Sequence, residues 1–100
     1  MNIRRRPQLT DQTVLSRTVG ITATESPDGV FLVDLKGGRL YQLNSSGRAV
    51  WEELGQPVCL SDLCRRLMLD FSADGSTVRR DVVGLLDRLQ RAKLIQVQNG

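Results

Sequence analysis

Hydrophobic and polar residues alternate in the first half of the chain, and hydrophobic residues recur every three or four positions in the second half. Alternation places side chains on opposite faces of a strand, whereas the longer period forms one face of a helix. The pattern therefore predicts three strands, then three helices and a short extended end. The predicted strands span 18–24, 30–35 and 39–43, the helices start near Ser45, Ser61 and Ser76 or Thr77, and the extended segment covers 94–97.

The second and third strands form a hairpin if Gly37 and Gly38 are its two turn residues, because glycine readily adopts the positive φ angles of such turns. This register pairs Leu32 with Leu43. Both faces are then apolar, which is unusual for a small antiparallel sheet. We expect the helices to cover one face, and the N-terminal segment, a second copy or a ligand to cover the other. The first face carries Val30, Leu32, Tyr41 and Leu43, and the second carries Phe31, Val33, Leu35 and Leu40.

Each predicted helix has a recognisable start, because short oxygen-bearing side chains can accept hydrogen bonds from the free N–H groups of a first turn. Asn44 to Ser46 can cap the first helix, which ends before Gly55. Ser61 is expected to cap the second helix, and Ser76 or Thr77 the third. The third helix is the longest, and its apolar face is formed by Val78, Val82, Leu85, Leu86 and Leu89.

Composition fits one small domain. The chain has 100 residues and a net charge of +3, and three of its arginines are consecutive, at Arg4–Arg6. We expect residues 1–13 to form a flexible basic tail and residues 14–100 to form the domain. The segment after the arginines is polar, so it does not resemble a signal peptide, and no stretch is long enough to span a membrane. These features predict a cytoplasmic protein.

The residues needed for catalysis or metal binding are scarce. The chain has no histidine, and its two cysteines, Cys59 and Cys64, cannot supply four zinc ligands. A disulfide between them is not expected in the cytoplasm. The glycines do not have the spacing of a phosphate-binding loop. We therefore expect no enzymatic activity, no cofactor and no metal.

A binding role has a physical basis in the third strand. In a simple meander this strand lies at the edge of the sheet, with unpaired N–H and C=O groups. The segment Arg39–Leu43 contains no proline and one charged residue, so nothing in it blocks pairing. Such an edge beside an apolar helix favours the addition of a peptide as the next strand.

The junction between the third strand and the first helix is similar to a known family signature. It contains Leu43-Asn44, then Gly47, and Val50-Trp51. Together with the element order and the helix pattern from Asp81 to Leu89, it resembles PqqD-like proteins, the peptide-recognition modules of ribosomal peptide-modification pathways. The resemblance covers about 18–97. Lys93 differs from it, because family members usually have a glycine there, and so does Leu85, where an aromatic residue is common.

This resemblance implies a fold and a function. The fold would be α+β and winged-helix-like, with a three-stranded antiparallel sheet followed by three helices. The protein would bind the leader segment of a precursor peptide against the third strand and the third helix, and present it to a leader peptidase or another modifying enzyme, as in lasso-peptide biosynthesis. The expected peptide-binding residues are Arg39, Leu40, Tyr41, Gln42, Leu43, Val78, Asp81, Val82, Leu85 and Leu89.

Three other interpretations stay open on the sequence. A role in making the quinone cofactor PQQ would replace the peptidase partner by a radical enzyme. A winged-helix nucleic-acid-binding module could use the arginines of the third helix, although nearby aspartates dilute that charge and the hairpin precedes the helices. The hairpin could instead form a homodimer through its second apolar face. The arginines in question are Arg79, Arg80, Arg88 and Arg91.

Overall fold

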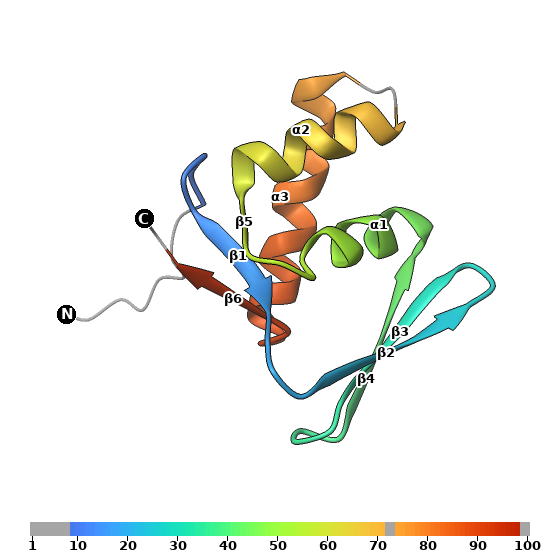
Figure 1. Ribbon diagram of the computed structural model, residues 1–100. Helices are drawn as coiled ribbons and strands as arrows, with labels where there is room; N and C mark the ends of the chain where they lie inside the picture. The colour runs from blue at the N-terminus through green and yellow to red at the C-terminus, as the bar shows by residue number, and fades with distance from the viewer. Residues whose placement is uncertain (1–8, 72–73, 99–100) are drawn as a thin grey trace.

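The computed structural model describes residues 9–71 and 74–98. Within these residues the chain forms three helices and six strands, and every strand pair is antiparallel (Figure 1). The strands are β1 (Val14–Arg17), β2 (Ile21–Ser26), β3 (Gly29–Asp34), β4 (Arg39–Asn44), β5 (Val58–Cys59) and β6 (Ile95–Gln98). The helices are α1 (Ser45–Glu53), α2 (Leu60–Phe71) and α3 (Gly75–Arg91).

The strands form two sheets, with the orders β5-β1-β6 and β2-β3-β4. Figure 1 shows the second sheet projecting to one side of the helices, while β1 and β6 lie at the other side. The α+β class, the three helices and a three-stranded antiparallel sheet that precedes them are confirmed, but the described strands form two sheets where the expectation had one. The chain turns at Val19 and Gly20, where Gly20 has a φ of 94°, so the expected first strand at 18–24 begins only at Ile21, and the separate strand β1 before the turn belongs to the other sheet.

The hairpin of β3 and β4 has a different register from the predicted one. Leu32 lies opposite Tyr41, not Leu43, and the turn contains four residues, 35–38. Asp34 explains the longer turn, because its Oδ1 accepts hydrogen bonds from the backbone N–H groups of Lys36 and Gly37, each at 3.1 Å. The carboxylate therefore stabilises a turn that begins two residues earlier than expected.

The helices begin at different caps from those predicted, apart from α1. Asn44 caps α1, with its Oδ1 accepting from the N–H of Gly47 at 2.9 Å. Asp74 caps α3 in place of Ser76 or Thr77. Hydrogen bonds from the Ser76 hydroxyl and the Thr77 N–H hold the pKa of Asp74 below its usual value, because they stabilise the carboxylate.

The backbone of the N-terminal segment caps the start of α2, in place of the Ser61 side chain that the sequence predicted. The N–H of Leu60 donates to the carbonyl of Thr13 at 2.9 Å, and the N–H of Ser61 donates to the carbonyl of Asp11 at 3.2 Å. Thr13 is fully buried, and Asp11 is paired with Arg79 of α3. Residues 9–13 of the expected tail thus lie against the domain. The rest of it, including Arg4–Arg6, lies outside the described residues, and a boundary at residue 13 stays a prediction.

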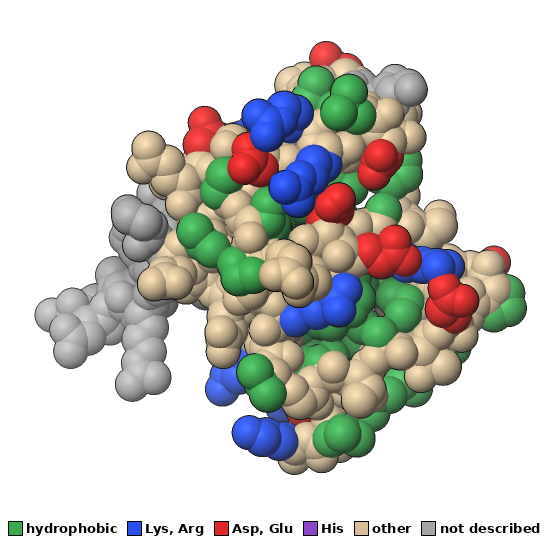
Figure 2. All heavy atoms as spheres, viewed as in Figure 1, with side chains coloured by type: hydrophobic (Ala, Val, Ile, Leu, Met, Phe, Trp, Pro, Cys, Tyr) green, Lys and Arg blue, Asp and Glu red, His purple; other side chains and the backbone are tan. Residues whose placement is uncertain are grey.

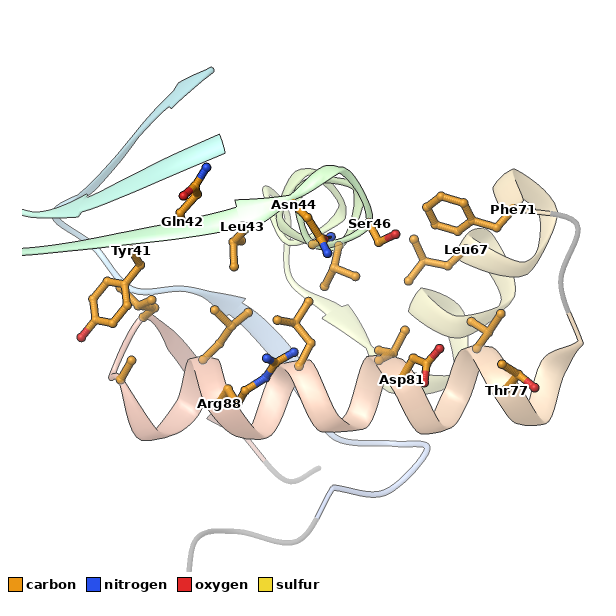
Figure 3. A pocket seen from close by; sticks show the side chains of 18 residues that line it. Tyr41, Gln42, Leu43, Asn44, Ser46, Leu67, Phe71, Thr77, Asp81 and Arg88 are labelled. Atoms are coloured by element: carbon orange, nitrogen blue, oxygen red, sulfur yellow. Dashed lines mark hydrogen bonds between the residues drawn. The ribbon is translucent and has the colours of Figure 1, made fainter. Parts of the chain in front are cut away.

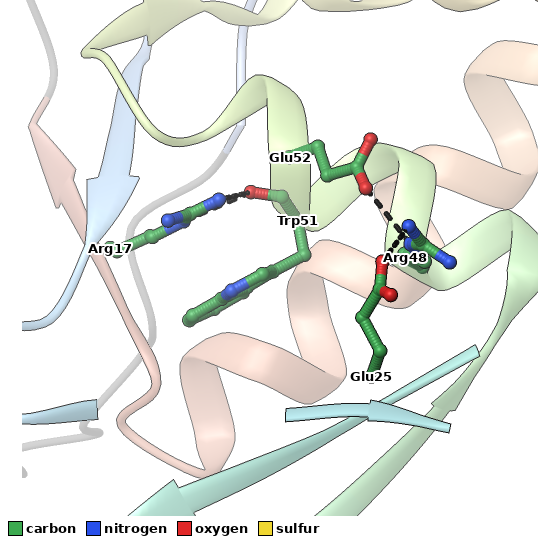
Figure 4. A network of polar contacts seen from close by, with 5 residues as sticks. All are labelled: Arg17, Glu25, Arg48, Trp51 and Glu52. Carbon is green, nitrogen blue, oxygen red and sulfur yellow. Dashed lines mark hydrogen bonds and ion pairs between the residues drawn. The ribbon is translucent and has the colours of Figure 1, made fainter. Parts of the chain in front are cut away.

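One hydrophobic core joins the helices to the inner face of the β2-β3-β4 sheet. The inner-face residues Val30, Leu32 and Leu43 are buried against α1, as expected for one face of the hairpin. Trp51 of α1 is 2% exposed, and the Arg17 guanidinium lies over its ring, 4.9 Å from the centroid (Figure 4). Arg17 also donates to the Trp51 carbonyl from Nε at 3.0 Å and from Nη2 at 2.6 Å, which ties β1 to the end of α1.

The end of α3 contains a strained residue. Lys93 has a φ of 61°, a conformation that costs a non-glycine residue roughly 1–2 kcal/mol. The Leu94 N–H donates to the Leu89 carbonyl at 2.9 Å and the Lys93 N–H to the Gln90 carbonyl at 3.0 Å, which is the hydrogen-bond pattern of a Schellman motif. The motif requires this left-handed residue, and lysine occupies it.

We expect Lys93→Gly to raise the free energy of unfolding by about 0.5–1 kcal/mol, the relief of strain less the entropy that glycine adds to the unfolded chain. Urea unfolding followed by circular dichroism measures this change. Ala92→Gly is the matched control, because Ala92 has a φ of −80° and glycine there should lower the stability. An unchanged or lower stability of Lys93→Gly would contradict the prediction.

Candidate functional site

A groove with a volume of about 730 Å³ lies between β4 and α3 (Figure 3). The last residues of β4 form one side of it, one face of α3 forms the other, and α1 and α2 close one end. Most of its lining is apolar. The residues that line it are Tyr41, Gln42, Leu43, Asn44, Ser46, Gly47, Val50, Leu67, Phe71, Thr77, Val78, Asp81, Val82, Leu85, Arg88, Leu89, Ala92 and Leu94.

The direction of the hydrogen-bonding groups in this sheet follows from its hairpins. Ser26 and Gly29 flank a two-residue turn and face each other, so their N–H and C=O groups point to the partner strand. These directions alternate along β3, so every second residue from Val30 to Asp34 bonds toward β4. The carbonyl of Asp34 fits this assignment, because it accepts from the N–H of Gly38, at 2.8 Å, on the β4 side.

The outer edge of β4 follows from the same alternation. Arg39, Tyr41 and Leu43 lie opposite the residues of β3 that bond toward β4, so their N–H and C=O groups point inward. Leu40 and Gln42 therefore direct their N–H and C=O groups away from the sheet. Among the described residues no strand pairs with this edge. The groove thus has a strand edge that can accept another strand.

The side of the groove formed by α3 also contributes to the core. Four apolar residues of α3 line the groove. Three of them are buried, Val78, Val82 and Leu89, and the fourth, Leu85, is half-buried. A helix can serve both purposes, because its apolar face is wider than the line of residues that contacts the core. The groove wall is therefore held rigidly by core packing.

The groove contains two charged side chains of opposite sign, both on α3. Figure 3 shows Arg88 toward the end occupied by Tyr41, and Asp81 nearer to Phe71 and α2. They are seven residues apart, which is about 10.5 Å along a helix. Asp81 is 71% exposed and lies 3.7 Å from Arg80 Nε, so it is only weakly paired.

The structure brings together eight of the ten residues that the sequence indicated as peptide-binding: Tyr41, Gln42, Leu43, Val78, Asp81, Val82, Leu85 and Leu89. The other two, Arg39 and Leu40, do not line the groove. Leu40 is 64% exposed on the outer face of the sheet, and Arg39 Nη1 lies 3.4 Å from the hydroxyl of Tyr41. A peptide-binding role for all ten stays a prediction.

Several residues that line the groove are not among those that the sequence indicated as peptide-binding. Leu67 and Phe71 come from α2, Ser46 and Gly47 come from the first turn of α1, and Asn44 is the last residue of β4. Arg88 lies three residues after Leu85 and seven after Asp81, so the helical period already places it on the same face. The spacing could therefore have predicted Arg88 as a groove residue. The two residues from α2 could not be predicted in this way, because their position in the groove depends on how the helices pack.

Outside the groove, the described residues do not indicate a second functional site. No group of three or more His, Cys, Asp or Glu side chains there could hold a metal ion. Burial raises the pKa of the Cys64 thiol, which makes it less reactive at neutral pH.

Among the described helices, none combines the length and the apolar character needed to cross a membrane. On the face shown in Figure 2, acidic and basic side chains are interspersed over α1 and α2; ion pairs there include Arg65–Asp62 and Arg48–Glu52.

Three solved structures resemble this fold. "TbiB1 in complex with the TbiA(beta) leader peptide" has a TM-score of 0.72 at 23% identity, covering 81% of this chain and 94% of that one. A lasso peptide synthetase B1 complexed with its leader peptide has a TM-score of 0.71 at 18% identity, covering 82% and 96%. The PqqD part of Methylobacterium extorquens PqqCD, described as a stand-alone recognition element for ribosomally synthesised and post-translationally modified peptides, has a TM-score of 0.75 at 15% identity, covering 89% and 95%.

No significant match was found among curated proteins. The comparisons indicate no catalytic family. The family described as coenzyme PQQ synthesis protein D (PqqD) matches residues 29–95, which include β3, β4, all three helices and the whole lining of the groove. Because this match extends over well more than half of the chain, the protein belongs to the PqqD family.

Proposed function

We propose that the protein binds the leader segment of a ribosomally synthesised precursor peptide and presents it to the enzymes that modify or process that peptide. The observation that carries this proposal is the free edge of β4, which faces α3 across an apolar groove. The leader would add to β4 as a fourth strand, and its side chains would enter the groove. Backbone hydrogen bonds would supply affinity that tolerates many sequences, and the groove would supply specificity.

Two of the similar structures support the ligand class, because they are complexes with leader peptides. One of the two is a lasso peptide synthetase by its name, so we propose the lasso-peptide pathway, with a leader peptidase as the partner enzyme. The alternative within the family is PQQ biosynthesis, with a radical enzyme as the partner. In either pathway the protein itself would act in the cytoplasm as a carrier without catalysis.

The energy of such a complex can be estimated. Four added backbone hydrogen bonds would contribute about 0.5–1.5 kcal/mol each, and two buried apolar side chains about 1.5–3 kcal/mol each. Association and the ordering of the peptide cost several kcal/mol. At the favourable end of these ranges, a gain of about 12 kcal/mol less a cost of about 4 kcal/mol leaves about 8 kcal/mol, which corresponds to a micromolar Kd.

Fluorescence anisotropy with the labelled leader of the precursor gene next to this protein's gene tests the proposal. We expect saturable binding with a micromolar Kd. Backbone NMR shifts on addition of the leader should concentrate on residues 39–46 and 77–89, the strand and helix sides of the groove. A Kd above about 100 μM, or shifts confined to α2, would contradict the proposal.

Salt dependence separates a peptide ligand from a nucleic acid. Three of the four arginines that could contact phosphates lie beside carboxylates: Arg79 beside Asp11, Arg80 beside Asp81, and Arg91 beside Asp87. We therefore expect leader binding to change little between about 50 and 200 mM salt, whereas duplex DNA binding through four phosphates would weaken roughly a hundredfold. Tight DNA binding with such a slope would favour the winged-helix interpretation.

A further inference from the structure

Arg88 differs from every other arginine in the described part of the chain. The other eight each have a hydrogen bond or an ion pair, whereas none is found for Arg88. Its neighbour on the same helix, Arg91, lies 3.1 Å from Asp87. Arg88 instead rises from α3 into the groove (Figure 3). An unpaired guanidinium thus stands where the peptide is proposed to lie.

A bound peptide would change the environment of this guanidinium. The added strand and its apolar side chains would remove part of the water around Arg88, and a charge that loses water without gaining a partner opposes binding. Leu85, Leu89 and Tyr41, which line the groove with it, offer at most one hydroxyl to the five N–H donors of an arginine. That hydroxyl already lies 3.4 Å from Arg39. An acceptor on the peptide would remove this cost.

We propose that Arg88 selects leader peptides that carry an aspartate or glutamate beside their apolar side chains, and that this acidic side chain lies at the Tyr41 end of the groove. The inference rests on the proposed function. A carboxylate matches the planar fork of arginine with two parallel hydrogen bonds. Asp81, about 10.5 Å away, repels a carboxylate at the other end. The two charges would thus also fix the direction in which the peptide lies.

A display experiment with random 12-residue peptides tests this without knowledge of the natural leader. The library is selected against the wild-type protein, against Arg88→Glu and against Arg91→Glu. Arg91→Glu is the matched control, because it makes the same change in net charge on the same helix but outside the groove lining. Circular dichroism confirms that each variant is folded.

We expect Asp or Glu to be enriched at one fixed position relative to the apolar residues of the peptides selected by the wild type and by Arg91→Glu. With Arg88→Glu, Lys or Arg should replace them at that position. Individual acidic peptides should bind Arg88→Glu about 10–100-fold more weakly than the wild type, the range expected for a charged hydrogen bond, and Arg88→Lys should recover part of the loss.

The outcomes distinguish this inference from the proposed function. Enriched peptides with apolar residues but no fixed acidic position, or the same peptides with Arg88→Glu, would overturn the role of Arg88 and leave peptide binding intact. A fixed acid that Arg91→Glu also loses would assign the preference to net charge and overturn it as well. The absence of any enriched peptide would count against both.

Discussion

Gln42→Pro is expected to abolish leader binding while the domain stays folded. The N–H of Gln42 points away from the sheet, so its removal breaks no hydrogen bond within the protein. A strand added to β4 would lose this donor, leave one of its own carbonyls unpaired and meet the proline ring. We expect these effects to cost about 3 kcal/mol together, which is more than a hundredfold in Kd. Anisotropy with the labelled leader measures the binding, and urea unfolding measures the stability.

The same sheet provides a matched control at its other edge. Ala23 of β2 is exposed, and the alternation that begins at Ser26 directs its N–H outward. Ala23→Pro therefore makes an equivalent change on an edge that does not line the groove, and leader affinity should be unchanged. Tyr41→Pro, by contrast, removes an N–H that bonds to β3, so it should destabilise the hairpin itself. Equal loss of binding in Ala23→Pro and Gln42→Pro would mean that the peptide does not add to β4.

The faces of the hairpin could be predicted although its register could not. The predicted and observed registers differ by two residues, and side chains alternate with a period of two. Leu32 and Leu43 thus remain on the buried face, and Leu40 remains on the exposed one. The register itself depended on Asp34, whose carboxylate competes with the two glycines for the position of the turn. Nothing in the alternation of apolar residues reveals that competition.

The second sheet could not be predicted because its pairing is not local. Leu15 of β1 lies opposite Val97 of β6 and opposite Val58 of β5, so the sheet joins segments from both ends and the middle of the chain. β5 has two residues, too few for a visible alternation. The start of α2 illustrates the same limit, because its cap is the backbone of a distant segment and not the side chain of Ser61.

The groove could be predicted to the extent that it follows local periods. The apolar period of α3 and the position of β4 at the edge of the hairpin gave both sides of the groove, and the family expectation is confirmed. The side chain of Leu40 lies on the outer face because side chains alternate along a strand, while its backbone N–H and C=O groups point to the free edge, so its role in peptide binding stays a prediction. Arg88 was considered only as a phosphate contact. Its significance lies in its lack of a hydrogen bond or ion pair, and this becomes clear only when the structure shows that the other described arginines each have one.

The outer face of the hairpin in the β2-β3-β4 sheet is largely apolar, as the alternation of its residues predicted. Leu35 is 67% exposed, Leu40 is 64% exposed, and Phe31 and Val33 are partly exposed. Within the described residues nothing covers these side chains, so the predicted cover by the N-terminal segment, a second copy or a ligand stays untested. The groove needs none of these, because its lining belongs to the opposite face and to the edge of β4.

Gly29→Ala is expected to remove the groove by disrupting β4. A Cβ at Gly29 would lie 1.9 Å from the carbonyl oxygen of Leu43 and 2.8 Å from the Cα of Asn44. These are backbone atoms at the point where β4 ends and Asn44 caps α1, so a side-chain rotation cannot relieve the overlap. The strands must separate there, and we expect a loss of about 3 kcal/mol or more in the free energy of unfolding, measured by urea denaturation.

Gly84→Ala is the control that isolates the steric cause. The chemical change is the same, but a Cβ at Gly84 on α3 meets no atom within 4 Å. Alanine is the better helix former by roughly 0.5–1 kcal/mol, so this variant should be more stable than the wild type. Because Leu43 and Asn44 line the groove, the leader should also bind Gly29→Ala weakly even where the variant is still folded, whereas its affinity for Gly84→Ala should be unchanged. A Gly29→Ala protein with wild-type stability would show that β3 and β4 can separate at this point without cost, and would contradict the prediction.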